Sequence, residues 1–196
     1  MVNRVTLGNG ERVAGSAVVI AAELPEAHRL IGTDLNSGTG SPRTALTLYF
    51  AAEQPVVKEP TLVLNGEGPG DGPVNHLAEI STAAPGYAPS GATLISASVL
   101  DPRGLSGADL EKAVRQQLSK WFGTGVNGWR HLRTYQIFDA LPPLDPPTMN
   151  TPQRPVKIRD RIYVCGDHRD HASIQGAMVS GRRAADAVAT DLGAKS

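Results

Sequence analysis

The sequence predicts an α+β protein with α/β-like segments near both ends, and three observations support this fold class. Between residues 44 and 100, short β-branched and aromatic runs alternate with clusters of Pro, Gly, Asn and Asp, as in an antiparallel sheet. After Ser106 and again after Ser173, apolar residues recur at helical spacing. Apolar runs at residues 17–22 and 162–165 predict buried strands outside the central region.

The N-terminal residues predict a hairpin, a strand and a short helix. Gly8-Asn9-Gly10 is a turn sequence between two short strands within residues 2–13. Pro25 suits the first turn of a helix that ends at Gly32. The run at residues 17–22 is typical of a strand buried on both faces, and we expect it to lie with the strand at residues 161–165 in one intertwined unit.

The central region predicts an antiparallel meander of strands at residues 44–50, 61–64, 76–81 and 93–100. The first strand alternates an apolar face, with Leu46, Leu48 and Phe50, and a mixed face, with Thr47 and Tyr49. A sheet of this kind can form the floor of a substrate cavity.

A helix and a further strand follow. Ser106 and Asp109 form a capping-box pattern at the start of a helix that ends at Gly123. The strand at residues 129–138 carries Arg130, His131 and Arg133, which are either a small basic face for an acidic substrate group or solvated strand residues. The proline-rich residues 141–147 cannot continue a helix or a central strand, so we interpret them as an extended connector.

Composition excludes several functional classes. Nineteen Lys and Arg balance nineteen Asp and Glu, so no overall field attracts nucleic acid or an anionic membrane. No apolar run approaches the roughly 20 residues of a membrane span, and the first residues lack the apolar stretch of a signal peptide. These features predict a cytoplasmic protein. Cys165 is the single cysteine, which excludes an internal disulfide, and its apolar surroundings predict a buried, inert thiol.

The most informative stretch is residues 161–192, where a strand runs through Gly166 and Asp167 into a helix after Ser173. An apolar stripe of mostly small residues on this helix predicts close packing: Ile174, Ala177, Met178, Gly181, Ala184, Ala185 and Val188. Free backbone N–H groups and the positive end of the helix dipole make such an N-terminus a seat for an electron-rich ligand.

These residues resemble the C-terminal signature of the flavin-dependent amine oxidase and phytoene desaturase-like oxidoreductases. The matching words are Val164-Cys165-Gly166-Asp167, Ser173-Ile174-Gln175-Gly176-Ala177 and Ser180-Gly181-Arg182-Arg183-Ala184-Ala185. The resemblance implies that Asp167 accepts a hydrogen bond from a ribityl hydroxyl of FAD, although an aspartate here can also simply cap the helix.

The same resemblance implies roles for the start of the helix. The backbone N–H groups of Ser173 and Ile174 would face the pyrimidine edge of the flavin and stabilise negative charge on the reduced ring. Gly176 and Ala177 would allow the cofactor to approach closely. Gly181, Ala184 and Ala185 would serve helix packing alone.

The resemblance also divides the chain. It assigns residues 1–32 and 161–196 to an FAD-binding domain, residues 33–140 to a substrate domain, and residues 141–160 to a connector. A complete protein of this family would oxidise C–N or C–C bonds of an apolar substrate by hydride transfer to FAD. Since flavin chemistry needs few protein acids or bases, the sequence singles out no catalytic side chain.

One expected element has no counterpart in this sequence. The family holds the pyrophosphate of FAD on a βαβ unit that carries G-x-G-x-x-G. Residues 66–72 are rich in glycine, but their spacing and Pro69 fit a hairpin loop instead. We therefore expect weak or no FAD retention unless a partner chain or a second copy supplies the missing unit.

Two alternatives from other functional classes stay open. One is a non-catalytic interaction module that pairs with itself or with a partner chain through exposed apolar strand edges. The other is a metal-dependent hydrolase that uses His168 and His171. Two histidines three apart, with Asp170 between them, match no established ligand spacing, so we predict exposed loop histidines and no metal site. Nucleophilic catalysis has no support, because the sequence contains no G-x-S-x-G.

Overall fold

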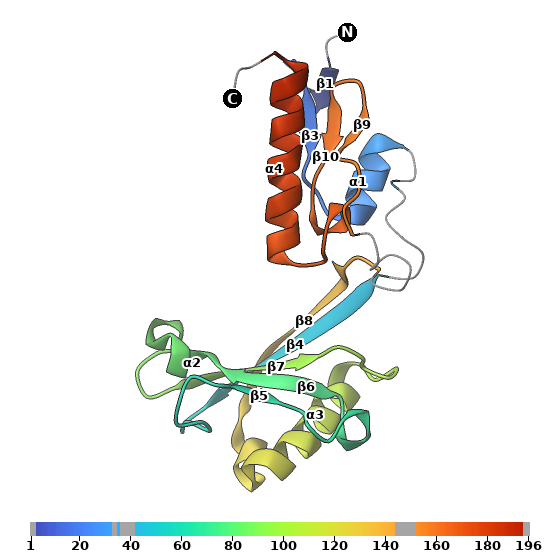
Figure 1. The fold of residues 1–196 in the computed structure, drawn as a ribbon. Helices are drawn as coiled ribbons and strands as arrows, with labels where there is room; N and C mark the ends of the chain where they lie inside the picture. Colours follow the sequence, from blue (N-terminus) through green and yellow to red (C-terminus); the bar gives the residue numbers. More distant parts are fainter. Residues whose placement is uncertain (1–2, 33–34, 36–41, 144–151, 194–196) are drawn as a thin grey trace. The chain divides into compact units, whose positions relative to one another are not determined.

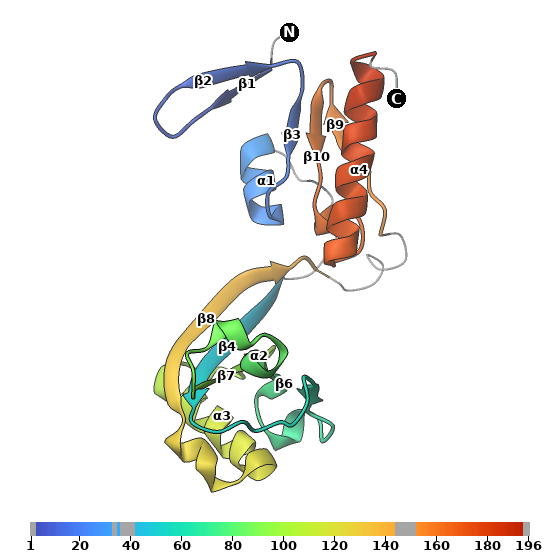
Figure 2. The ribbon, with the colours of Figure 1, turned by 90° about the vertical axis from the view of Figure 1, so that its left-hand side faces the viewer.

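The computed structural model describes residues 3–32, 35, 42–143 and 152–193. The chain forms two compact units, each described here by itself (Figures 1 and 2). The central unit comprises Thr44–Phe138, and the terminal unit comprises Met1–Arg43 together with Asp139–Ser196.

The central unit is built on a five-stranded sheet in the order β5-β6-β7-β4-β8. Its strands are β4 (Arg43–Ala52), β5 (Leu62–Leu64), β6 (Val74–Glu79), β7 (Thr93–Val99) and β8 (Arg130–Leu141). The pairs β5/β6, β6/β7 and β7/β4 are antiparallel. Residues 65–73 connect β5 to β6, as expected of a hairpin loop, and contain the short helix η1 (Pro69–Asp71).

The predicted meander is wrong in one respect, because β4 pairs with β7 and not with β5. Leu46, Leu48 and Phe50 explain the difference, since all three are buried and a strand with a wholly apolar face is best covered inside a sheet. The strand expected at residues 76–81 also ends early, and α2 (Ile80–Ala83) and η2 (Pro85–Tyr87) follow it.

The core of the central unit lies between this sheet and α3 (Gly107–Phe122), which covers one sheet face in Figure 1. Leu110, Val114 and Leu118 of the helix pack with Leu48 and Phe50 of β4. The helix ends at Gly123, as predicted, and η3 (Thr124–Gly128) leads into β8.

Ser106 is the N-cap residue of α3, but its side chain makes no capping hydrogen bond. The predicted capping box is therefore wrong. Gly107, the first helical residue, has a φ of 52° and so departs from helical geometry at the position that would bring the hydroxyl over the first turn.

The terminal unit contains a hairpin and a three-stranded sheet. As predicted, β1 (Asn3–Thr6) and β2 (Arg12–Gly15) form the antiparallel hairpin. The sheet has the order β3-β10-β9, from Val18–Ile20, Ile162–Val164 and Lys157–Arg159. The pairing of β3 with β10 is parallel, and it joins two segments of the intertwined unit that the sequence predicted.

This sheet lies between α1 (Leu24–Ile31) and α4 (Ile174–Asp191), as both views show. Val164 packs on one side with Ala27 and Ile31 of α1. Tyr163 and Cys165 pack on the other side with Ala184 of α4. Gly32 has a φ of 73° and ends α1 in the left-handed conformation that glycine favours.

The prediction of a strand buried on both faces is wrong for β3. Val19 is 44% exposed, because β3 is the edge strand and only β10 pairs with it among the described residues. In the described ranges, the structure contains no helix with the length and apolarity needed to cross a membrane.

Candidate functional site

The strand β10 ends in a backbone arrangement that only glycine accommodates well. Gly166 has a φ of 150°, a conformation that residues with side chains rarely adopt. A Cβ at this position would lie 2.5 Å from Cε1 of His168. The chain can therefore turn from the strand into η5 (Asp167–Arg169) while the His168 ring packs directly against the turn.

Ser180 of α4 fixes this turn to the helix. Its Oγ accepts a hydrogen bond from the N–H of Gly166 (2.9 Å) and donates to the carbonyl of the same glycine (2.7 Å). Ser180 is fully buried. The sequence prediction missed this role, although a hydroxyl at helical spacing from two small residues, three after Ala177 and four before Ala184, was the available signal.

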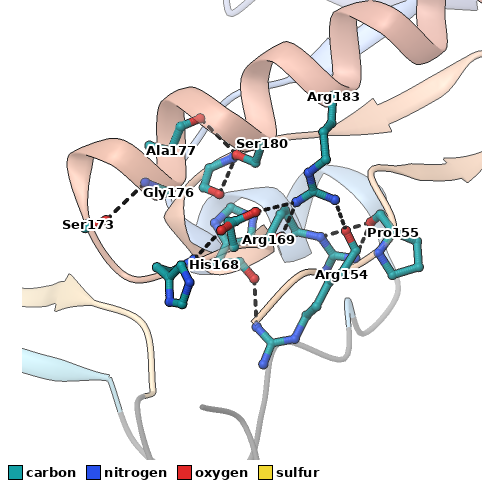
Figure 3. Close-up of polar contacts among 12 residues, drawn as sticks. Arg154, Pro155, His168, Arg169, Ser173, Gly176, Ala177, Ser180 and Arg183 are labelled. Atoms are coloured by element: carbon teal, nitrogen blue, oxygen red, sulfur yellow. Dashed lines mark hydrogen bonds and ion pairs between the residues drawn. The ribbon is translucent and has the colours of Figure 1, made fainter. Parts of the chain in front are cut away.

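One hydrogen bond holds the first turn of α4 (Figure 3), and the close approach of the preceding loop requires a small residue in that turn. Ser173 is the N-cap, and its Oγ accepts a hydrogen bond from the N–H of Gly176 at 3.0 Å. A Cβ on Gly176 would lie 1.9 Å from the backbone carbonyl oxygen of His171. The glycine thus lets the preceding loop lie directly on the helix.

Two backbone amides at this helix start have no protein partner in the described part of the chain. The N–H of Ser173, one of the predicted ligand donors, instead donates to the carbonyl of His171 (2.7 Å). The amides of Ile174 and Gln175 make no such bond. The available donors are therefore shifted by one residue from the predicted pair, because the loop itself occupies the first.

Asp167 offers the complementary acceptor. Its side chain is 30% exposed, and no hydrogen bond to its carboxylate occurs among the described residues. Nδ1 of His168 lies 3.8 Å from its Oδ1, beyond hydrogen-bond distance. Asp167 also makes no capping bond to α4, whose N-cap is Ser173, so the capping alternative is not what this structure contains.

The loop between Asp167 and α4 is not the exposed loop that we predicted. His168, Arg169 and Asp170 are only 1%, 3% and 7% exposed. The guanidinium of Arg169 donates to the carbonyls of Leu35 (2.6 Å) and Pro155 (3.1 Å), which draws the loop inward. Burial, with the nearby Arg154 and Arg183 charges, lowers the pKa of Arg169 to about 10.

Two further arginines complete this network, which Figure 3 shows. Arg183 of α4 donates to the carbonyls of Arg154 (3.0 Å) and Arg169 (2.6 Å), and pairs with the Asp170 carboxylate at 3.0 Å. Arg154 donates to the carbonyl of His168 at 2.8 Å. Hydrogen bonds from these guanidinium groups to backbone carbonyls therefore hold the buried loop, since each guanidinium presents several donors.

The two histidines of the loop differ. His171 is exposed, as predicted, whereas His168 is buried and neither of its ring nitrogens has a hydrogen-bond partner. Within the described ranges, no group of three His, Cys, Asp or Glu side chains is arranged to hold a metal ion. Cys165 is buried, and its burial raises the pKa of the thiol.

The site therefore combines two amides without a protein partner, a carboxylate that accepts no hydrogen bond among the described residues, and close-packed glycines. Such an arrangement suits a planar electron-rich ring with an attached hydroxyl-bearing chain. A sequence profile described as flavin containing amine oxidoreductase matches residues 2–189. The chain belongs to this family. The membership confirms the resemblance that the C-terminal motifs gave, and it implies a flavin cofactor.

Solved structures give the same fold at low sequence identity. An oxidoreductase from Methanosarcina mazei has a TM-score of 0.64 and 15% identity, covering 91% of this chain and 44% of its own. A reduced UDP-galactopyranose mutase has a TM-score of 0.67 and 14% identity, covering 98% and 44%. A putrescine oxidase double mutant has a TM-score of 0.61 and 15% identity, covering 96% and 46%.

This chain of the flavin-containing amine oxidoreductase family thus spans less than half the length of those proteins. Their likeness confirms the α+β fold class. A comparison with curated protein sequences finds no match.

The residues at the start of α4 fit a flavin. The unpaired amides of Ile174 and Gln175 lie at the positive end of an 18-residue helix, where an electron-rich ring edge is stabilised. Ala177 is half-buried in the same turn, and its carbonyl lies 2.9 Å from the Ser180 hydroxyl.

The predicted apolar stripe of α4 is only partly correct. Ala184 is buried, but Ile174 and Met178 are 79% and 70% exposed, and Ala185 is also exposed. The face that packs on β10 carries Gly176, Ser180 and Ala184. Gly181 has open space around it, so close packing does not explain this glycine. Small residues face the sheet because it approaches closely, and the larger apolar residues are left on the opposite side.

Proposed function

We propose that this chain is the C-terminal portion of an FAD-dependent oxidoreductase that oxidises C–N or C–C bonds of an apolar substrate. Two observations carry the proposal: the amides of Ile174 and Gln175 at the start of α4 have no protein partner, and the Asp167 carboxylate accepts no hydrogen bond among the described residues. Family membership over residues 2–189 supports the same chemistry. The flavin, when bound, supplies the hydride acceptor.

Each residue of the site has a distinct task in this proposal. Asp167 accepts a hydrogen bond from a ribityl hydroxyl, and the Ile174 and Gln175 amides bind the electron-rich edge of the ring. Gly166 and Gly176 keep the strand end and the loop tight, so that no side chain blocks the approach. Arg169 and Arg183 hold the loop in place through backbone carbonyls.

We also propose that a dinucleotide-binding half on a partner chain completes the site. The letters G-x-G-x-x-G occur at residues 123–128, but these residues follow α3 and lead through η3 into β8, so they are not the strand-to-helix turn of a dinucleotide-binding unit. The similar solved structures are more than twice as long. Exposed apolar groups that such a half can cover are Ile174 and Met178 on α4 and Val19 on the edge strand β3.

The same exposed groups favour the second candidate, a non-catalytic module that pairs with itself or with a partner chain. The free edge of β3 can accept another strand by backbone hydrogen bonding. The two candidates differ in one respect, because only the oxidoreductase requires the amides of Ile174 and Gln175 to bind a flavin.

Ligand titrations followed by amide NMR separate these candidates. We expect FMN, which carries the ring and ribityl chain, to shift the amide signals of Gly166, Ile174 and Gln175. ADP, which carries the pyrophosphate, should leave them unchanged, because no βαβ unit that would hold the pyrophosphate occurs among the described residues. After desalting, the visible spectrum of the purified protein should show weak or no flavin absorbance.

Matched carboxamide variants supply the control. Asp167→Asn should weaken FMN binding about tenfold, as expected for loss of a charge-assisted hydrogen bond. Asp186→Asn, on the exposed side of α4, should bind FMN like the wild type. An FMN titration that leaves Ile174 and Gln175 unshifted would overturn the proposed function and favour the interaction module. Stoichiometric FAD in the purified chain would overturn the partner requirement.

A further inference from the structure

The central unit carries a hollow that is separate from the candidate flavin site in the terminal unit. It has a volume of about 540 Å³ and is lined by residues of β4, β7 and β8: Thr47, Tyr49, Leu94, Leu132, Arg133, Tyr135 and Ile137. Thr47 and Tyr49 belong to the mixed face of β4, which points away from the core under α3. Small-molecule sites commonly have volumes of about 300–1,000 Å³.

A second hollow of about 550 Å³ adjoins the first. The two share Tyr49 and Leu94 as lining residues, so they form one continuous surface on this sheet face. The second hollow adds Leu62, Ile80 and Tyr87, which are also apolar or aromatic. An elongated, mostly apolar molecule matches a surface of this composition.

The first hollow contains an ordered cluster of two rings and one cation. The rings of Tyr49 and Tyr135 meet edge to face, with centroids 5.9 Å apart and an interplanar angle of 89°. The guanidinium carbon of Arg133 lies 4.9 Å from the centroid of Tyr135. This cation–π contact favours a position of the guanidinium over the ring, and it leaves the N–H groups available to a ligand.

Arg133 is also the one charged residue that lines the first hollow. No acidic group or carbonyl pairs with it in the described part of the chain. In the second hollow the charged residue is Glu79, which is buried and already accepts hydrogen bonds from the amides of Val56 (2.8 Å) and Val57 (3.1 Å). The joined surface therefore has one uncompensated charge, and that charge is positive.

We infer that this surface binds an apolar molecule that carries one carboxylate, and that Arg133 is the residue that selects it. A single guanidinium presents one planar fork, which matches one carboxylate in a bidentate pair. A cationic amine is disfavoured, because it would lie beside an unpaired like charge. As a substrate assignment this inference rests on the proposed function, whereas the binding event itself needs no flavin.

Three probes with one aromatic body and different charges test the inference on the full chain without flavin. Naphthylacetate, naphthylacetamide and naphthylethylamine are titrated by calorimetry against the wild type. We expect the acid to bind about tenfold more tightly than the neutral amide, and the amine most weakly. Amide NMR signals of Thr47, Tyr49 and Tyr135 should shift with the acid.

Two variants on the same strand identify the residue. Arg133→Gln should make the affinities for the acid and the neutral amide equal, and should leave the affinity for the neutral amide unchanged. Arg130→Gln removes an exposed arginine that does not line the hollow, so the preference for the acid should stay. Unchanged amide spectra of the free variants would verify that both remain folded.

The inference is overturned if no probe binds, if the amine binds most tightly, or if Arg133→Gln keeps the preference for the acid. These results are independent of the FMN titration, because the readout residues lie in the central unit and those of the flavin site lie in the terminal unit. Either proposal can therefore fail while the other holds.

Discussion

The central and terminal units are stabilised in different ways. In the central unit, β4, β6 and β7 bury a continuous apolar core against α3. In the terminal unit, two small apolar clusters lie on opposite sides of a three-stranded sheet. Hydrogen bonds to backbone carbonyls connect the loop, the strand end and α4 in this unit, and their donors are Arg169, Arg183 and Ser180. The comparison teaches that one continuous apolar core holds the central unit together, whereas the terminal unit has only small apolar clusters and a network of arginine hydrogen bonds beside them.

The largest expected effect comes from the core of the central unit. Phe50→Ala removes a fully buried ring that packs with Trp129. The guanidinium carbon of Arg115 lies over the same ring, 4.9 Å from its centroid. We expect a loss of about 3–5 kcal/mol in the free energy of unfolding. Hydrogen exchange should show lost protection in Thr44–Phe138 and unchanged protection in β10 and α4.

A control variant on the same unit sharpens this result. Leu62→Ala changes a side chain that is 56% exposed and should alter stability by less than about 0.5 kcal/mol. Equal loss of protection in both units with Phe50→Ala would show that they unfold together and would contradict the division drawn here.

The second prediction concerns two glycines of α4 with opposite surroundings. Gly176→Ala forces a Cβ toward the His171 carbonyl and should destabilise the terminal unit by about 1–3 kcal/mol. Gly181→Ala adds a methyl group in open space and should stabilise the helix by up to about 1 kcal/mol. Thermal unfolding of both variants by circular dichroism measures the difference in sign. Two shifts of the same sign would refute the role given to Gly176.

The smallest expected effect is a pH dependence in the terminal unit. The hydroxyl of Tyr163 donates to the carboxylate of Asp191, which also pairs with Lys157 at 2.5 Å. The hydrogen bond to Asp191 raises the pKa of Tyr163 to about 12, above the ordinary value of about 10. The stabilisation is therefore complete below about pH 10 and is lost as the pH rises through about 12.

Denaturant unfolding at several alkaline pH values, followed in the terminal unit, measures this loss. Tyr163→Phe removes the ionising group and should flatten the dependence. Asp191 contributes at the acidic end, since Lys157 and Tyr163 lower its pKa and this contribution fades as the pH falls through the lowered value. A Tyr163→Phe protein with the wild-type alkaline profile would assign the loss to another group.

The candidate site shows how far sequence reasoning extends. The strand, the Gly166-Asp167 turn and the helix after Ser173 were predicted because each depends on neighbouring residues. The burial of His168 and Arg169 was not predicted, because the acceptors of Arg169 include Leu35, 134 residues earlier in the chain. Local sequence patterns contain no information on such a partner.

The same division appears in the sheets. Alternating side chains predicted β4 and its apolar face, but the choice of β7 as its neighbour depends on which strands bury that face together. Gln117 is another example, since its side chain pairs with both backbone groups of Val74, at 2.7 and 3.1 Å. Helical spacing places Gln117 on the apolar face of α3, seven residues after Leu110, but it does not reveal the partner that satisfies the amide there.

The sequence by itself determined the family, the α+β class, the ends of α1 and α3, the start of α4, and the glycines at the turns, because these follow from backbone preferences and short motifs. Only the tertiary structure decided that Ser180 is buried against the strand end and Gly176 against the loop, while Met178 is exposed. The face of a helix that is buried depends on the shape of what packs against it, and here a close strand end and loop accept only small side chains.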